Sequence, residues 1–323
     1  MSKKVLVFGR NGQLGSEVIR MLSSSDYDGL CPSEEDADIT SSQKIDKVVS
    51  EYKPDFIVNC AAFTNVDKCE SDLDTALAVN VKGVENCARA ALANNATLIH
   101  VSTDYVYDGT TGLEKVTHAI HHENERPLNF YGKTKLLGEE AARKILEPEH
   151  PSQLIILRTS GLYGIYGNNF LKKMENLLEK NEDAEYSIVA DQWYCPTSAA
   201  QLAQQIKWFI DLTEVDKQHI LNVKTNIFNA SNTGFTSPYL FLAKYFALRE
   251  KTHLINRMIP VSFDDYFNTI NPSTARRPKA VVLRNDLAKR NFCAFTSIDE
   301  ALDEYVFEAD RADGKYDKEE NYD

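Results

Sequence analysis

The sequence of 323 residues predicts an α/β protein built on a doubly wound parallel sheet, with a smaller C-terminal α/β region. Three observations predict this fold. An apolar strand at residues 4–8 runs into glycines and then into a helical pattern, strand and helix patterns alternate through the first 160 residues, and the pattern becomes irregular after Arg158. Such alternation requires a parallel sheet that helices cover on both faces.

The first strand-to-helix connection carries regularly spaced glycines. It reads Gly9-Arg10-Asn11-Gly12-Gln13-Leu14-Gly15, and a helical pattern follows at residues 16–22. In such a turn Gly9 permits the tight bend, Gly12 lets the backbone approach a pyrophosphate, and Gly15 allows close helix packing. The Gly-x-x-Gly-x-x-Gly spacing is typical of short-chain dehydrogenase/reductases and predicts a Rossmann-like fold. The alternative is a turn that merely favours glycine.

The other elements of the first 160 residues continue the alternation. Strands are predicted near 28–31 and at 55–59, 97–102 and 154–158, and helices at 42–52, 73–94 and from about Tyr131 to 146. We therefore predict a dinucleotide-binding domain at residues 1–160.

The second half of the chain has aromatic-rich loops between helices predicted at 169–179, 198–212 and 237–249. We expect residues 161–309 to form a substrate-binding cap over the carboxyl edge of the sheet, sharing strands and helices with the first domain. Residues 310–323 are charged and nearly free of aliphatic side chains, which predicts an acidic, disordered tail.

Composition excludes several classes of function. A net charge of −12 argues against a nucleic-acid partner, although backbone amides and local arginines still allow an anionic ligand. Without 18 consecutive apolar residues or a signal-peptide core, we expect a soluble, cytoplasmic protein with no membrane partner. The six cysteines, without Cys-x-x-Cys spacing, indicate reduced thiols: Cys31, Cys60, Cys69, Cys87, Cys195 and Cys293.

A second motif suggests proton transfer to a carbonyl. Tyr131 and Lys135 lie four residues apart on a predicted helix and share one face, and Thr103 ends an apolar strand. We expect Lys135 to lower the pKa of the phenol, which makes Tyr131 a proton donor. The spacing alone is weak evidence, because a chain with 15 tyrosines shows it about once by chance. The glycine turn upstream gives it weight.

A cluster of metal-ligand residue types falls in the loop before Tyr131. It comprises His118, His121, His122 and Glu123. These residues lack the regular spacing of a metal scaffold, so we predict solvated loop histidines and no metal.

The chain resembles the dTDP-4-dehydrorhamnose reductases, which are extended short-chain dehydrogenase/reductases. The matching segments are residues 9–15, 38–40, 59–70, 102–109, 127–139, 158–160, 167–170, 191–192, 196–197 and 275–278. The resemblance implies NADPH-dependent reduction of the C4 keto group of a nucleotide-linked 4-keto-6-deoxy sugar by a homodimer. Tyr131 would protonate the sugar oxygen, Thr103 would hydrogen-bond the same oxygen, and Lys135 would hold the ribose hydroxyls.

The resemblance also implies a set of cofactor-binding residues. They are Gly9, Arg10, Asn11, Gly12, Gln13, Leu14, Asp38, Ile39, Ala61, Ala62, Phe63, Asn80, Tyr131 and Lys135. Arg10 suits the 2′-phosphate of NADPH, whereas Glu34 and Glu35 suit NADH. We expect NADPH to be preferred and NADH to be tolerated.

The substrate-binding residues that the resemblance implies are Thr103, Asp104, Asn169, Gln192, Trp193 and Arg277. Arg277 would hold the diphosphate, and Trp193 would stack on the base or sugar. The alternatives are a solvated ion pair for Arg277, a loop turn for Gln192, a loop-fixing role for Asp104 and a core position for Trp193.

Two residues depart from the family pattern. Gly161 stands where the family usually has tryptophan, and Tyr194 stands where it often has a small residue. Either change could accompany a different nucleotide, so the choice between a thymidine and a uridine diphosphate sugar stays open.

Three other functions compete with the reductase. A dehydratase needs an Asp-Glu pair after the threonine, but Tyr105 follows Asp104 here. An epimerase also keeps the tyrosine and lysine. A regulatory NADP-binding subunit, like that of methionine adenosyltransferase, retains the cofactor site, but residues 191–192 and 275–278 preserve substrate-side features that it would not need.

Overall fold

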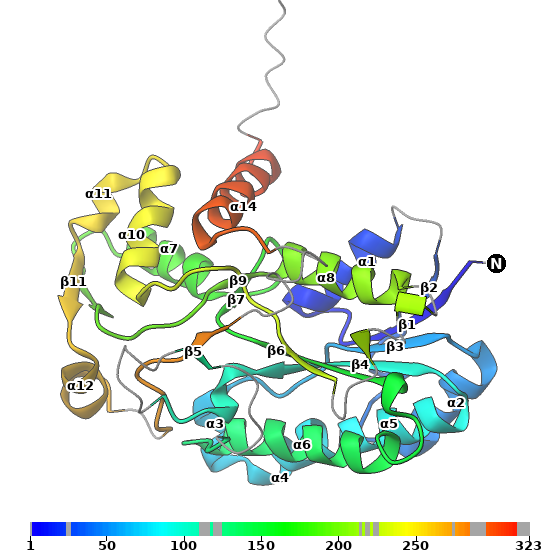
Figure 1. The fold of residues 1–323 in the computed structure, drawn as a ribbon. Helices are drawn as coiled ribbons and strands as arrows, with labels where there is room; N and C mark the ends of the chain where they lie inside the picture. Colours follow the sequence, from blue (N-terminus) through cyan, green and yellow to red (C-terminus); the bar gives the residue numbers. More distant parts are fainter. Residues whose placement is uncertain are drawn as a thin grey trace, which may run out of the picture.

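A six-stranded parallel sheet forms the centre of the protein. The computed structural model describes residues 2–23, 27–109, 117–118, 125–212, 215–216, 220–221, 226–272, 275–284 and 295–314. The strands stand in the order β10, β6, β4, β3, β1, β2 (Figure 1). Their bounds are β1 (Lys4–Phe8), β2 (Asp28–Leu30), β3 (Phe56–Asn59), β4 (Thr97–Thr103), β6 (Leu154–Thr159) and β10 (Ile227–Asn229).

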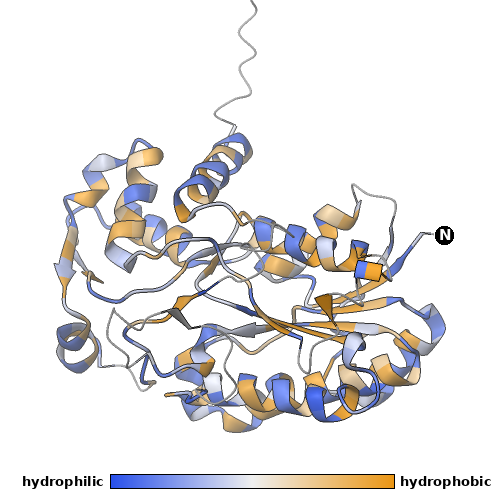
Figure 2. Cartoon of the chain, viewed as in Figure 1, coloured by the Kyte–Doolittle hydropathy of each residue, from blue (hydrophilic) through white to orange (hydrophobic). Residues whose placement is uncertain are grey.

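Helices cover both faces of this sheet, which confirms the doubly wound, Rossmann-like α/β fold. One face carries α1 (Gln13–Ser23) and α8 (Ala199–Asp211); the other carries α2 (Ser42–Tyr52), α5 (Val84–Ala93) and α6 (Phe130–Leu146). Because alternate strand residues point to opposite faces, Val5 and Val7 join one core, and Leu6 and Phe8 join the other. Figure 2 shows the corresponding concentration of hydrophobic residues along the strands.

The order of the strands reverses beside β1. The chain places β2 on one side of β1 and then crosses to place β3 on the other side. In a parallel sheet, such a switch point opens a crevice at the carboxyl ends of the two diverging strands. The end of β1 is also where the glycine turn begins.

The long helix that we expected at residues 73–94 is a continuous helical run with an irregular middle. It consists of α4 (Leu73–Leu77), the π-helical stretch η1 (Ala78–Gly83) and α5. Such π-helical insertions often occur at functional sites. The buried Asn80 lies inside this stretch, and a Cβ atom on Gly138 of α6 would lie 2.2 Å from its carbonyl oxygen, so α6 passes very close to η1.

The C-terminal region has a hydrophobic core of its own, formed by α7, β8, α10 and α14. The bounds of its main elements are α7 (Phe170–Lys180), β8 (Tyr186–Val189), α10 (Pro238–Leu248), α11 (Thr252–Ile255), β11 (Met258–Val261), α12 (Phe263–Asp265), η5 (Tyr266–Ile270) and α14 (Ile298–Ala312). The short elements of the chain are α3 (Val66–Ser71), η2 (Asp104–Val106), β5 (Thr117–His118), η4 (Pro151–Gln153), β7 (Leu162–Tyr163), β9 (Thr197–Ser198) and β12 (Val282–Leu283). Strands β8 and β11 pair in parallel at one end of the molecule (Figure 1).

Segments beyond residue 160 also complete the central sheet. Strand β10 pairs with β6 at the edge of the sheet, and α8 packs against α1. The chain therefore returns to the first half after building part of the C-terminal region. The division into domains at residue 160 stays a prediction.

The expected start of the tail at Asp310 is wrong, because α14 continues to Ala312. Asp310 is buried and pairs with Arg249 at 2.8 Å, which fixes the last turn of the helix. Residues 315–323 lie outside the described part of the chain. Among the residues that the structure describes, no helix is long and apolar enough to span a membrane.

Candidate active site

The turn between β1 and α1 closes tightly against the end of β3. Gly9 has a φ of +84°, and a Cβ atom on it would lie 2.6 Å from the backbone nitrogen of Ala61. A Cβ atom on Gly15 would lie 2.1 Å from the Gly9 carbonyl oxygen. Gly12 is different, because a Cβ atom there would meet only that oxygen, at 3.4 Å. A ligand can therefore approach the backbone at Gly12.

A cavity of about 340 Å³ lies at this switch point. Nine of the expected cofactor-binding residues line it: Gly9, Arg10, Asn11, Gly12, Asp38, Ile39, Ala61, Ala62 and Phe63. Gln13 and Leu14 form the first turn of α1 beside it. The free N–H groups of a helix N-terminus and its dipole favour an anion, so this cavity fits the pyrophosphate of a dinucleotide.

A cation and a carboxylate flank the adenosine end of the same cavity. The exposed Arg10 donates from Nη1 to the carbonyl of Cys31, just after β2, at 3.1 Å. Glu34 also lines the cavity, whereas Glu35 does not. The end of the second strand is where such proteins distinguish a ribose hydroxyl from a 2′-phosphate.

Asn80 supports the cavity wall from behind and does not line the cavity. Its Oδ1 accepts the N–H of Phe63 at 2.9 Å, and its Nδ2 donates to the Phe63 carbonyl at 3.0 Å and to the Thr134 hydroxyl at 3.1 Å. The side chain therefore ties the loop after β3 to α6. This bonding pattern gives Asn80 a positioning role at the cavity wall, and a direct contact of Asn80 with the cofactor stays a prediction.

The start of α6 places Tyr131 beside the end of β4. The Asn129 side chain caps the helix by accepting the Gly132 N–H at 2.8 Å, and its Nδ2 donates to the Arg276 carbonyl at 2.7 Å. Tyr131 follows in the first turn, and its phenol hydrogen-bonds with Thr103, the last residue of β4. Tyr131 and Thr103, two of the three expected catalytic residues, are therefore neighbours in the structure.

Burial raises the pKa of Tyr131, and this effect outweighs the hydrogen bond with Thr103, which lowers it. The phenol therefore stays protonated near neutral pH and can donate. We expected Lys135 to lower this pKa, but the Lys135 Nζ instead donates to the carbonyl of Val101 at 2.7 Å, and the net shift is upward.

Lys135 lies against a buried histidine of β4. Its Nζ is 3.5 Å from Nε2 of His100, whose Nδ1 is 3.3 Å from the amide nitrogen of Asn59. Because the Asn59 oxygen accepts the Ala61 N–H, its NH₂ group faces Nδ1 of His100. Burial holds the pKa of His100 well below its usual value and lowers the pKa of Lys135 to about 8.

Asp104 follows Thr103 and is buried. Its Oδ2 accepts the Ser160 hydroxyl at 2.6 Å, and its Oδ1 accepts the Thr103 hydroxyl at 3.2 Å. Burial raises the pKa of Asp104 to about 6. These bonds fix the ends of β4 and β6 to each other, and Asp104 also lines a second cavity.

A buried ionic network fixes α6 against β4 and β6. The Arg158 side chain is fully buried, donates from Nε to Glu139 at 3.0 Å and pairs with Glu125. It also donates to the Tyr107 hydroxyl at 2.9 Å, and Glu139 accepts the Ser102 hydroxyl. Because removing one member would leave buried charge uncompensated, the network holds α6, and with it Tyr131 and Lys135, in one position.

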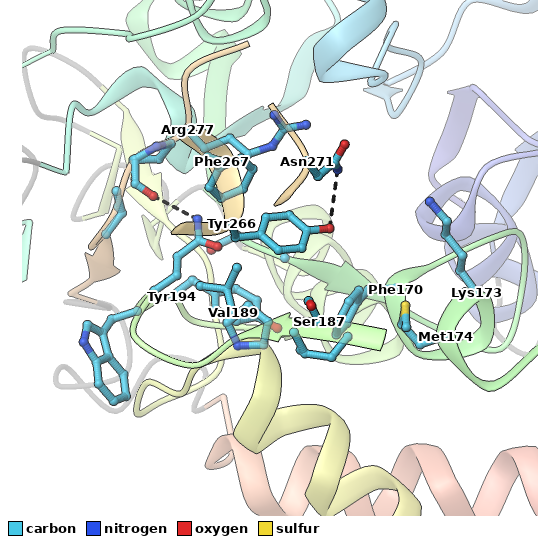
Figure 3. A pocket seen from close by; sticks show the side chains of 18 of the residues that line it. Phe170, Lys173, Met174, Ser187, Val189, Tyr194, Tyr266, Phe267, Asn271 and Arg277 are labelled. Carbon is cyan, nitrogen blue, oxygen red and sulfur yellow. Dashed lines mark hydrogen bonds between the residues drawn. The ribbon is translucent and has the colours of Figure 1, made fainter. Parts of the chain in front are cut away.

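The second cavity, of about 490 Å³, extends from Asp104 and Tyr105 into the C-terminal region. Asp104, Gln192, Trp193 and Arg277 line it, as expected for substrate-side residues, whereas Thr103 and Asn169 do not. Figure 3 shows its wall of aromatic and polar side chains.

Arg277 forms an ion pair at this cavity. Its Nη1 and Nη2 lie 3.1 and 2.7 Å from the two carboxylate oxygens of Asp67, and its guanidinium lies over the ring of Phe267 at 5.3 Å from the centroid. The Arg277 side chain is 17% exposed and that of Asp67 is 48% exposed. The ion pair that we named as the alternative for Arg277 is thus present, in the two-pronged geometry with which arginine binds phosphate.

The segment at residues 191–193 contributes to the same cavity. Gln192 donates from Nε2 to the Pro278 carbonyl at 2.9 Å, and Trp193 packs edge-on against Phe235 with the ring centroids 5.7 Å apart. Both contacts join this segment to other parts of the C-terminal region.

Asn169 is a helix cap that lines a neighbouring cavity together with Lys173 and not the larger cavity itself, and its contact with the substrate stays a prediction. Its Oδ1 accepts the Lys172 N–H at 3.1 Å, which begins α7, and its Nδ2 donates to the Gly164 carbonyl at 2.8 Å. Both ends of the amide are thus engaged within the fold.

Several residues of the cavity were not predicted from the sequence. Phe170 and Lys173 of α7 lie on one side, and Tyr266, Phe267 and Asn271 come from the segment after β11 (Figure 3). The aromatic residues at positions 263, 266 and 267, close together in a loop region, were a signal that could have indicated a binding wall.

The histidine cluster before Tyr131 cannot be placed. His121, His122 and Glu123 lie outside the described residues, as does the side chain of His118. Among the residues that are described, no group of three or more histidine, cysteine or acidic side chains could hold a metal ion.

The fold and the site together define a class: a Rossmann-like protein with a glycine turn at the switch point and a Tyr-x-x-x-Lys pair, as in the short-chain dehydrogenase/reductases. Within that class, the chain belongs to the family described as RmlD substrate binding domain, whose model matches residues 3–311. The resemblance to the dTDP-4-dehydrorhamnose reductases is therefore confirmed.

Individual relatives agree with this assignment. The chain is 35% identical over 283 residues to a dTDP-4-dehydrorhamnose reductase of Aggregatibacter actinomycetemcomitans, over 85% of this chain and 88% of the relative. Its structure is similar to that of a dTDP-4-dehydrorhamnose reductase of Bacillus anthracis in complex with NADP. The TM-score is 0.80 and the sequence identity 32%, and the match covers 95% of this chain and 100% of that one. It is also similar to the structure of a dTDP-4-dehydrorhamnose reductase of Clostridium acetobutylicum. The TM-score is 0.81 and the sequence identity 34%, and the match covers 94% of this chain and 98% of that one.

Proposed function

We propose that the protein is an oxidoreductase that uses NADPH, and less readily NADH, to reduce the C4 keto group of a nucleotide-linked 4-keto-6-deoxy sugar. The reaction is the conversion of dTDP-4-dehydro-L-rhamnose to dTDP-L-rhamnose, or its uridine diphosphate equivalent. The relatives named above as dTDP-4-dehydrorhamnose reductases, one of them in complex with NADP, support this assignment.

One observation carries the proposal: the Tyr131 and Lys135 pair lies between residues that line the two cavities. Tyr131 hydrogen-bonds with Thr103 and packs edge-on against Tyr105, which lines the larger cavity, with the ring centroids 5.8 Å apart. Lys135, one helical turn away, lies 3.5 Å from His100, and Asn59, the partner of His100, directly precedes Cys60 in the wall of the glycine-turn cavity. A ligand in each cavity would therefore meet at this pair.

The residues of the chain then have distinct roles. Tyr131, which burial keeps protonated, donates its proton to the C4 oxygen, and Thr103 hydrogen-bonds the same oxygen. Lys135 holds the ribose hydroxyls and stabilises the phenolate after the proton has left. Bound NADPH supplies the hydride. Arg277 binds the diphosphate of the sugar nucleotide through its planar fork.

The test is oxidation of NADPH in the presence of the keto sugar. The substrate is generated from dTDP-glucose or UDP-glucose by a dehydratase and a 3,5-epimerase, and the loss of NADPH absorbance is followed. Oxidation that requires the keto sugar supports the proposal, and the faster of the two nucleotides identifies the substrate. NADPH binding without oxidation would favour the regulatory-subunit alternative, and epimerisation without net oxidation would favour an epimerase.

We further propose a cytoplasmic homodimer, as the resemblance to the family implies. Light scattering of the purified protein tests the oligomeric state: a mass of one chain would contradict it. Fractionation of the producing cells tests the location.

A further inference from the structure

The ring of Tyr194 fills the space that a side chain at position 161 would need. Gly161 follows β6 and Ser160 and has a φ of +49°. A Cβ atom on it would lie 2.5 Å from Cε2 and 2.7 Å from Cδ2 of the Tyr194 ring. The ring therefore lies directly on the glycine, in the place that any side chain at position 161 would need.

The Tyr194 ring has little room to step aside. The Tyr194 backbone exchanges two hydrogen bonds with Thr236, of 3.1 and 3.0 Å. Its ring packs edge-on against the buried Phe241, with the centroids 6.5 Å apart. The next residue, Cys195, is fully buried. The backbone and one edge of the ring are thus held by the C-terminal core.

The Tyr194 ring also lies at the end of the larger cavity that is near the expected catalytic residues. Gly161 and Tyr194 both line the larger cavity, together with Asp104, Tyr105 and Ser160. Burial raises the pKa of Tyr194, so its phenol is a hydrogen-bond donor over the whole neutral range.

The part of the larger cavity next to α7 is lined by other kinds of side chain. Lys173 and Phe170 of α7, with Tyr266 and Asn271, provide a cation, aromatic faces and an amide there (Figure 3). These groups suit a nucleotide base and its phosphates. The Asp104 end, where Tyr194 lies, is left for the sugar.

We propose that Tyr194 is a specificity-determining residue that contacts the sugar ring of the substrate, and that Gly161 is required because it makes room for the Tyr194 ring. The aromatic face covers an apolar edge of the 6-deoxy sugar, and the phenol donates to a sugar hydroxyl. This inference rests on the proposed function and goes beyond it by naming the groups that select the sugar.

The test separates the sugar from the nucleotide. Calorimetry measures the affinity of the protein for dTDP, for dTDP-L-rhamnose in the presence of NADP, and for NADPH. We expect Tyr194→Phe to weaken dTDP-L-rhamnose binding about tenfold, through one lost hydrogen bond, and Tyr194→Ala to weaken it further. Affinities for dTDP and NADPH should change less than about twofold. Tyr239→Phe, in a half-buried tyrosine of α10 that does not line the cavity, is the matched control and should leave all three affinities unchanged.

A double-mutant cycle tests the role of Gly161. Gly161→Ala in the wild type displaces the Tyr194 ring and should weaken dTDP-L-rhamnose binding as strongly as Tyr194→Ala does, but in the Tyr194→Ala background it should have little further effect. Thermal unfolding confirms that each variant folds.

The outcomes distinguish this inference from the proposed function. If wild-type protein binds and reduces the keto sugar while both Tyr194 variants keep wild-type affinity for dTDP-L-rhamnose, the inference is overturned and the function stands. Equal loss of dTDP and dTDP-L-rhamnose affinity in Tyr194→Phe would place Tyr194 at the nucleotide and also overturn it. Failure of the wild type to bind both dTDP-L-rhamnose and its uridine diphosphate equivalent would overturn both.

Discussion

Arg277 is held by Asp67, a residue 210 positions earlier in the chain, through hydrogen bonds of 3.1 and 2.7 Å. The pair joins α3 to the segment before β12 at the larger cavity. A carboxylate and a phosphate both present two oxygens to the fork of an arginine. Asp67 therefore occupies the donors that a diphosphate needs.

Weakening this ion pair should favour the ligand. We expect Asp67→Asn to tighten the binding of dTDP several-fold, because Arg277 then has a weaker internal partner. Arg277→Lys should weaken it about tenfold, because an ammonium cannot make the two-pronged contact. Calorimetry at one fixed ionic strength measures both. Weaker binding in Asp67→Asn would show instead that Asp67 orients Arg277 for the phosphate.

Tyr131→Phe should separate chemistry from binding. The variant loses only the transferred proton, so we expect turnover to fall about 10²- to 10⁴-fold while the affinity for NADPH changes little. Steady-state rates with the keto sugar and a fluorescence titration of NADPH measure the two quantities. Unchanged turnover would remove Tyr131 from the mechanism.

Lys135 should set an alkaline limit to activity. Its pKa is about 8, because burial disfavours the ammonium, and the proposed role needs the charged form. We therefore expect kcat/KM to fall as the pH rises through about 8. Lys135→Arg keeps the charge to a much higher pH, so the residual kcat/KM of this variant should not fall near pH 8. If kcat/KM of the variant falls at the same pH, the decrease belongs to the titration of another group.

The first half of the fold could be predicted from the sequence, for local physical reasons. Ser41 and Asn129 accept N–H groups of the first helical turns, which explains why the predicted starts of α2 and α6 agree with the structure. The strands at 55–59, 97–102 and 154–158 were readable because they are buried on both faces. The π-helical stretch around Asn80 has no comparable sequence signature.

Contacts between residues far apart in the sequence could not be predicted. Strand β10 has three residues, and only its pairing with β6 makes it part of the sheet. Asp67 lies within the matching segment 59–70, but nothing in the neighbouring sequence connects it with Arg277. Gly161 and Tyr194 were recognised as two separate departures from the family, whereas the structure shows them to be one steric arrangement.

Arg10 should determine the choice of cofactor. It lies at the mouth of the glycine-turn cavity beside the end of β2, where a 2′-phosphate is expected. We expect Arg10→Ala to weaken NADPH binding about tenfold and NADH binding hardly at all. Parallel titrations with both cofactors measure this preference. A wild type that binds NADH more tightly than NADPH would contradict our assignment.

Asp104 should make stability depend on pH in a defined direction. Burial raises its folded-state pKa to about 6 from an ordinary value of 3.8, so the folded protein binds the proton more tightly than the unfolded chain does. The resulting stability is complete below about pH 4 and is lost as the pH rises through about 6. The full effect is about 3 kcal/mol, of which about 1 kcal/mol lies between about pH 5 and pH 7.

Asp104→Asn removes this titration while keeping a side chain of similar shape. The free energy of unfolding of the variant, measured with urea, should therefore rise relative to that of the wild type by about 1 kcal/mol between about pH 5 and pH 7. Other groups titrate in both proteins and cancel in the difference. A difference that stays constant with pH, or that shrinks as the pH rises, would mean that the hydrogen bonds from Ser160 and Thr103 compensate for the burial of the carboxylate.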